Sequence, residues 1–191
     1  YVSEFPDDSV FLCVVDPRVG AESRHPAIVR TDAFWFVGPD NGLFNEVARR
    51  AACVAWWDIT WRPESLSASF HGRDLFAPVA AGLALGGEPP GEPVDPSTRI
   101  HTDWPADLPE VIYIDRYGNA VTGIRAESVG GGARLAVAGL ELRRARTFAD
   151  VRPGEGMWYE NSNGLAEIAV NQGDAARVLD LAVGSPVKVR D

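Results

Sequence analysis

Two polar stretches of the sequence place reactive side chains where a binding site would be expected. In "VVDPRVG", residues 14–20, Asp16 comes directly after an apolar run that is typical of a strand. In "SFHGRD", residues 69–74, His71 precedes a predicted helix, whose first turn has unpaired backbone N–H groups. Ligands of α/β proteins bind beyond the carboxyl ends of strands. We therefore predict a polar site around Asp16 and His71, the alternatives being a turn cap and a structural loop histidine.

Four other polar stretches have simpler interpretations. "RH" at 24–25 is compatible with a solvated loop, and "PDNG" at 39–42 is a turn signal. "IDRYGN" at 114–119 and "YENSNG" at 159–164 are typical of hairpin turns. Taken alone, none of them indicates a function.

Composition excludes several classes of protein. The 191-residue chain has a formal net charge of -9, which argues against nucleic-acid binding, and it has no apolar run long enough to span a membrane. Its three histidines have no metal-ligand spacing, and there is neither a phosphate loop nor a nucleophile elbow. Cys13 and Cys53 lie in apolar surroundings, which predicts buried free thiols and a cytoplasmic protein.

The elements that must position the polar residues fall into two parts. An α/β part is predicted from strands at 9–16, 26–30 and 34–38 and helices at 45–57 and 74–86, the first strand being buried on both faces. A Gly- and Pro-rich linker or crossing arm follows at 86–98, and alternating strands then dominate. We predict an α/β domain over residues 1–92, a linker over 93–102 and an all-β domain over 103–191.

Within the β part, strands are expected on both sides of residues 117–119 and after the "GGG" turn at 130–132. The last stretch, from "GMWYE" to "VLDL", predicts a strand, a turn, a strand and a short helix.

Five sequence blocks occur in an order that is shared with a known family. They are "FPDDSVFLCVVDPRVG", "FVGPDNGLF", "SFHGRDLFAPVAAGLALG", "IDRYGNAVTGI" and "YENSNGLAEIAVNQGDAARVLDLAVGSPV". Together they resemble the S-adenosylmethionine (SAM) hydroxide adenosyltransferase family, the SAM hydrolases related to the fluorinating and chlorinating enzymes. The resemblance covers nearly the whole chain.

The resemblance implies a Rossmann-like N-terminal domain, a small C-terminal β-barrel and a homotrimer with each site between two subunits. The family's first strand and its "TDFG" motif have no counterpart here, so the N-terminal domain is expected to be incomplete. Whether the chain is active without that segment is left open.

The implied reaction is hydrolysis of SAM to adenosine and L-methionine by water that attacks C5′ opposite the sulfonium sulfur. SAM is the substrate, and neither a cofactor nor a metal is expected. The family's catalytic Asp–Arg–His set corresponds to Asp16, Arg24 and His71. Arg24 requires a one-residue gap in the alignment, and a gapless count places Ser23 there instead. A cation beside Asp16 would keep that carboxylate ionised.

The C-terminal blocks are implied to bind the substrate. Asn119 corresponds to a residue near the adenosine and Asp115 to one near the methionine amino group, while Val170 and Gln172 would meet adenine. The other implied binding residues are Tyr159, Ser162, Glu167, Phe70 and Gly72.

Two alternatives remain from the sequence. One is halogenation of SAM on the same scaffold, but the fluorinating enzymes have Tyr and then Ser where this chain has His71 and Gly72, and glycine offers no hydroxyl to a halide. The other is a non-catalytic fragment that binds SAM or adenosine.

Overall fold

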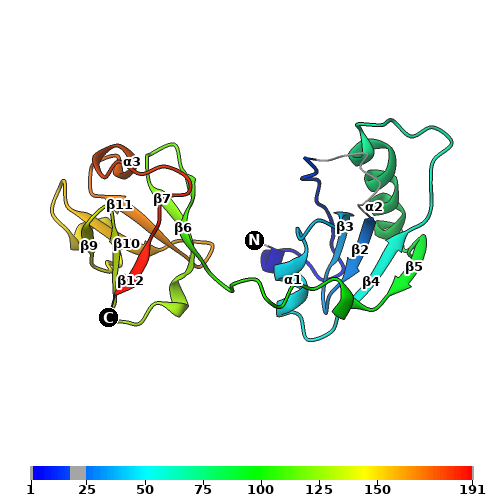
Figure 1. Cartoon of the computed structure of the whole chain (residues 1–191), viewed down its shortest axis with the longest axis horizontal. Coiled ribbons are helices and arrows are strands. Elements are labelled where there is room, and N and C mark those ends of the chain that lie inside the picture. Colours follow the sequence, from blue (N-terminus) through cyan, green and yellow to red (C-terminus); the bar gives the residue numbers. More distant parts are fainter. Residues whose placement is uncertain (1, 18–24, 191) are drawn as a thin grey trace. The chain divides into compact units, whose positions relative to one another are not determined.

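The computed structural model describes residues 2–17 and 25–190. By its internal contacts the chain divides into two compact units, Tyr1–Trp104 and Pro105–Asp191. The first unit has one sheet and the second has two (Figure 1), and each unit has its own apolar core. The fold is therefore mixed α/β with several sheets and few helices.

The first unit is built on a five-stranded sheet in the order β1-β3-β2-β4-β5. β1 runs parallel to β3, and the other neighbouring pairs are antiparallel. The strands are β1 (Val10–Leu12), β2 (Pro26–Arg30), β3 (Trp35–Pro39), β4 (Ala55–Ile59) and β5 (Gly91–Val94).

Helices cover both faces of this sheet (Figure 1). On one face, η2 (Gly72–Phe76), a π-helical turn, continues into α2 (Ala77–Ala84), and their apolar side chains pack on Ile28, Val37 and Ile59. On the other face, Phe44 and Ala48 of the α1 region (Asn45–Arg50) pack on Val29, Phe36 and Trp56. Alternate residues of each strand supply the two faces, as the period of a strand requires. Short 3-10 turns lie at η1 (Val2–Glu4) and η3 (Pro96–Thr98).

The second unit contains two antiparallel sheets around one main core. Their orders are β10-β11-β7-β6 and β12-β8-β9. Trp158, Leu135 and Ile168, which come from both sheets, are fully buried in that core. The elements are β6 (Leu108–Ile114), β7 (Ala120–Arg125), η4 (Ala126–Ser128), β8 (Arg134–Val137), β9 (Leu140–Leu142), η5 (Phe148–Asp150), β10 (Gly156–Glu160), β11 (Leu165–Val170), α3 (Ala175–Val178) and β12 (Lys188–Arg190).

Several predicted elements are confirmed, and two are wrong. β2 and β3 match the predicted strands, as do β6, β7, β10, β11 and the short helix α3. The predicted strand at 9–16 is not buried on both faces: β1 is an edge strand, and Val14 and Val15 are exposed. The predicted helix at 45–57 ends at Arg50, because residues 55–59 pair with β2 as a strand.

The predicted linker at 93–102 lies within the first unit. Its first residues belong to β5 and pair with β4, and Arg99 forms ion pairs with Asp40 and Asp58 at 3.0 and 2.7 Å. The contacts instead change from one unit to the other between Trp104 and Pro105.

The two cysteines are free, but they differ in exposure. Cys13 is half-buried, and burial raises the pKa of its thiol, whereas Cys53 is exposed. The prediction of a buried thiol is wrong for Cys53, because Cys53 precedes β4 in a loop whose backbone N–H donates to Asp32.

Candidate functional site

Six of the residues predicted to bind substrate line one cavity of about 650 Å³ in the second unit. These are Asp115, Asn119, Tyr159, Glu167, Val170 and Gln172. They come from the β6–β7 turn, from β10 and β11, and from the turn after β11. Residues that are far apart in the sequence thus converge on one concave surface.

The β6–β7 turn holds Asp115 and Asn119 in fixed positions. Asp115 Oδ1 accepts hydrogen bonds from the backbone N–H groups of Tyr117 and Asn119 at 2.8 and 2.9 Å. Gly118 has φ +83°, and a Cβ there would lie 2.1 Å from Asp174 Oδ1, so only glycine fits. The turn therefore presents the half-buried Asp115 and the buried Asn119 to the cavity.

Glu167 is the central polar group of the strands behind this turn. It is 7% exposed, and its carboxylate accepts hydrogen bonds from Tyr159 Oη and, at 2.9 Å, from Asn161 Nδ2. Burial, then the hydrogen bond to Glu167, raises the pKa of the Tyr159 phenol. Because a carboxylate only accepts, Tyr159 must donate to it, and the phenol stays protonated at physiological pH.

Two aromatic residues that line this cavity were not predicted from the sequence. Tyr117 and Phe148 line it, and Tyr117 is 66% and Phe148 40% exposed. The Phe148 and Tyr159 rings lie 5.6 Å apart. Exposed aromatic faces beside polar groups suit a heterocyclic ring. A tyrosine within a predicted turn was the available signal for Tyr117, and no pattern marked Phe148.

Ser162 lies outside this cavity. It lines a separate hollow of about 710 Å³ with Arg144, Arg146 and Asn161. Asn161 lines this second hollow, and its side-chain amide donates a hydrogen bond to Glu167, which lines the first cavity. The structure therefore does not place Ser162 with the six residues above.

In the first unit, Asp16 lies after a strand and His71 lies at the start of a helix. Asp16 is half-buried and follows β1, and His71 begins the helix that continues through η2. The two segments are packed together, because a Cβ on Gly72 would lie 3.2 Å from Val14 Cγ1. Asp16 and His71 thus come from neighbouring segments at one edge of the sheet.

The helix starts with a π-helical turn at Gly72–Phe76, in which Asp74 is held by hydrogen bonds. Asp74 accepts hydrogen bonds from Arg73 and from the backbone N–H of Ser67, and these bonds, that of Arg73 first, lower the pKa of Asp74. Phe70 is 58% exposed, with the Arg73 guanidinium 5.0 Å from its ring centroid. π-Helical turns are frequent at functional sites. Arg24 and Ser23, the two candidates for the third catalytic position, lie outside the described residues.

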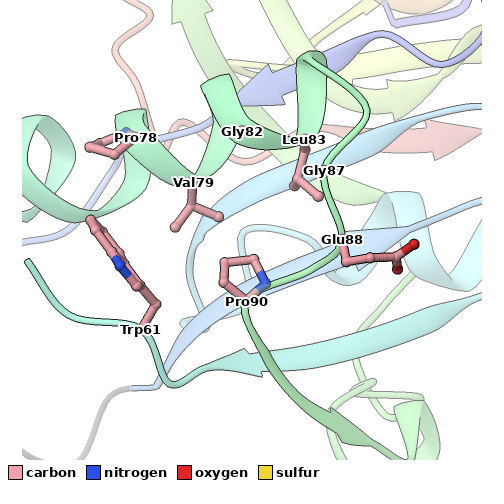
Figure 2. A pocket seen from close by; sticks show the side chains of 8 residues that line it. All are labelled: Trp61, Pro78, Val79, Gly82, Leu83, Gly87, Glu88 and Pro90. Carbon is pink, nitrogen blue, oxygen red and sulfur yellow. The ribbon is translucent and has the colours of Figure 1, made fainter.

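The first unit also contains an apolar cavity of about 210 Å³ beside α2 (Figure 2). Trp61, Val79, Leu83 and Pro90 line it, together with the carboxylate-bearing Glu88. None of the predicted site residues that the structure describes lines it, so we do not assign it to the candidate site.

Within 2–17 and 25–190, no three His, Cys, Asp or Glu side chains are grouped closely enough to hold a metal ion. Over the same ranges the helices are all too short or too polar to cross a membrane.

Comparison with known proteins gives a consistent result. Residues 1–92 match the SAM hydroxide adenosyltransferase N-terminal domain, and residues 109–188 match the C-terminal domain of the same family. The (R)-S-adenosyl-L-methionine hydrolase of Thermus thermophilus is 39% identical over 96% of this chain and 76% of its own length. The hydrolase of the same name from Salinispora tropica is 38% identical over 95% of this chain and 74% of its own length.

Solved structures agree. An uncharacterized conserved protein from Thermotoga maritima superposes with a TM-score of 0.85 at 33% identity, covering 99% of this chain and 80% of that one. The order of the sequence blocks, the convergence of the C-terminal residues on one cavity and these matches lead to one conclusion: the chain belongs to the SAM hydroxide adenosyltransferase family.

Proposed function

We propose that this protein hydrolyses S-adenosyl-L-methionine to adenosine and L-methionine. The observation that carries the proposal is the cavity of the second unit, where six residues that the family resemblance implies for substrate binding converge, in a chain that matches the family over both of its domains. The relatives' name specifies the R configuration, so we take the R sulfonium diastereomer as the preferred substrate.

In this reaction an oxygen of water forms a bond to C5′ while the bond from C5′ to sulfur breaks. The electron pair of that bond goes to sulfur, methionine leaves as a neutral thioether, and the attacking water releases a proton. The leaving group needs no acid, so the protein has only to position and polarise the water and hold the ribose. Asp16 accepts a hydrogen bond from water or ribose, Arg24 keeps Asp16 ionised, and His71 contacts the water.

The second-unit cavity suits the rest of the substrate. Asp115, Glu167 and Asp174 give it a negative character that favours a sulfonium and an α-ammonium group. Tyr117 and Phe148 offer aromatic faces to adenine, and Asn119 offers an amide. Ser162, Phe70 and Gly72 complete the proposed binding set.

The domain and subunit organisation is part of the proposal. The matched ranges 1–92 and 109–188 support a two-domain organisation, for which the family resemblance implies a Rossmann-like first domain and a small β-barrel as the second. We propose a homotrimer in which catalytic groups of one subunit meet substrate-binding groups of a neighbour. Light scattering should give three times the chain mass of 20.6 kDa. A monomer that still binds adenosine would exclude this assembly.

The function is tested by incubating the protein with each SAM diastereomer in ¹⁸O-labelled water and following the products by mass spectrometry. We expect ¹⁸O in the 5′-hydroxyl of adenosine and none in methionine, at the same rate with EDTA present. Adenosine binding without turnover would contradict hydrolysis. A 5′-halo-adenosine formed with chloride or fluoride would favour halogenation, for which Gly72, lacking a hydroxyl, offers no support.

The role of Asn119 gives a binding prediction. Asn119→Ala should weaken adenosine binding by roughly 1–3 kcal/mol, because polar partners buried by the ligand lose their hydrogen bond. Isothermal calorimetry measures it. Ser128→Ala, which removes a hydroxyl bonded to the Arg125 carbonyl in the same unit, is the control and should bind adenosine normally. Unchanged affinity of the Asn119 variant would contradict its assignment.

A further inference from the structure

The turn at residues 39–42, "PDNG", contacts the chain on both sides of the segment that carries Asp16. The Asn41 side-chain amide donates to the Val15 carbonyl at 2.7 Å. The backbone N–H of Asp40 donates to the His25 carbonyl at 2.9 Å. The sequence of this stretch predicts only a turn. The structure shows in addition that the turn donates hydrogen bonds to the backbone carbonyls of Val15 and His25.

The turn is itself firmly held by the first unit. Asn41 Oδ1 accepts a hydrogen bond from the Leu43 N–H at 3.2 Å. Gly42 has φ +92°, and a Cβ on it would lie 2.3 Å from Trp104 Cη2, so the indole occupies the space that any side chain would need. Asp40 forms an ion pair with Arg99 at 3.0 Å, and both side chains are largely buried.

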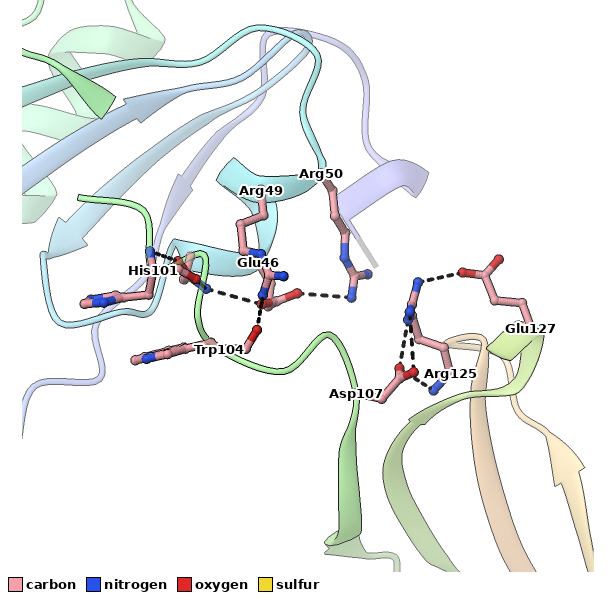
Figure 3. Close-up of polar contacts among 9 residues, drawn as sticks. Glu46, Arg49, Arg50, His101, Trp104, Asp107, Arg125 and Glu127 are labelled. Carbon is pink, nitrogen blue, oxygen red and sulfur yellow. Dashed lines mark hydrogen bonds and ion pairs between the residues drawn. The ribbon is translucent and has the colours of Figure 1, made fainter. Parts of the chain in front are cut away.

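Trp104, which covers the turn, is fixed in its own place. Its ring stacks on His101 at 4.7 Å, and its carbonyl accepts a hydrogen bond from Arg49 of α1 at 2.9 Å (Figure 3). Asn45 Oδ1 accepts from the His101 N–H at 2.7 Å. The turn is thus anchored to α1 and to the end of the first unit, so that Asn41 is a rigid donor.

The bond to Val15 acts directly on the backbone of Asp16. The Val15 carbonyl and the Asp16 N–H belong to one planar peptide group, so fixing the oxygen also fixes the nitrogen to which the Asp16 Cα is attached. Earlier in this segment, the Cys13 N–H donates a backbone hydrogen bond to the Val37 carbonyl of β3 at 2.9 Å. Asn41, which follows β3, therefore restrains the backbone at Val15, the residue directly before Asp16.

We propose that Asn41 is a positioning residue: through the Val15 carbonyl it holds Asp16 in the orientation that the attack of water requires. This rests on the proposed hydrolysis. A small displacement of a catalytic group is enough to slow a reaction strongly without changing how substrate binds.

The test uses Asn41→Asp, because aspartate keeps the acceptor for the Leu43 N–H and loses the donor to Val15. Asn41→Ala loses both. We expect kcat for SAM to fall about tenfold in both variants, with KM and adenosine affinity within about twofold. Hydrogen–deuterium exchange should increase in peptides covering residues 12–16. Asp95→Ala, which removes the cap of a 3-10 turn in the same unit, controls for a general loss of stability and should leave both readouts unchanged.

The outcomes separate the two proposals. If the wild-type protein makes no adenosine, the proposed function fails. Independently of that result, unchanged hydrogen–deuterium exchange of residues 12–16 in Asn41→Asp would overturn the anchoring of Val15. If the wild type is active and exchange rises while kcat stays the same, Asn41 does not position Asp16. A fall in kcat for Asn41→Ala alone would assign Asn41 to the turn and overturn the proposal.

Discussion

Asp16→Asn should lower kcat for SAM hydrolysis by roughly 10²-fold or more, with a much smaller effect on KM. Asparagine has the size of aspartate, but it lacks the charge that polarises water or the ribose hydroxyl, and a positioned acid–base group usually contributes about this much. Steady-state kinetics measures both constants. Asp103→Asn removes the same charge from an exposed position in the same unit and should retain full activity.

The competing explanation for Asp16 is uniform binding. If the carboxylate only bound the ribose, its loss would raise KM and leave kcat unchanged. That result would remove Asp16 from the chemistry, although it would leave the family assignment intact.

His71→Ala should likewise reduce kcat by roughly 10²-fold, because the imidazole is the other group proposed to contact the attacking water. The matched control is Arg73→Ala, which removes the hydrogen bonds from Arg73 to Asp74 in the same turn. It tests whether a disturbed conformation at the start of the helix is enough to slow the reaction. We expect its kcat to stay within about twofold of the wild type. Circular dichroism checks the folding of both variants.

Equal losses in the two variants would show that the shape of the turn, and not the imidazole, determines the rate. A normal kcat in His71→Ala with a raised KM would likewise contradict the catalytic role.

Local pattern predicted the strands that are short apolar runs bounded by turn residues. β7 and β11 are examples: both are six residues long and largely buried, and the glycine and asparagine of the turns beside them marked their ends. Local pattern failed at residues 55–59. Their apolar spacing continued the helical period of α1, but the segment is rich in aromatic and branched residues and pairs with β2 as a strand. β5 was missed because Pro93 argues against a strand, although an edge strand tolerates proline.

The candidate site was less predictable from local pattern. Asp16 and His71 stood out by their positions, but the six residues of the second-unit cavity followed only from the family resemblance. Spacing along the chain does not reveal that the turn after β6 and the end of β11 face the same space. The contacts of Asn41 were invisible for the same reason, since its partner is 26 residues earlier in the chain.

The π-helical turn at Gly72–Phe76 has an evolutionary consequence. Such a turn accommodates one more residue than an α-helix would in the same length. Each residue of an α-helix rotates the chain by about 100°. Loss of a single codon within this turn would allow an unbroken α-helix, and with α2 still packed on the sheet, His71 would rotate by about that angle around the helix axis. The direction of the imidazole is therefore inherited through the number of residues in the turn as well as through the histidine itself.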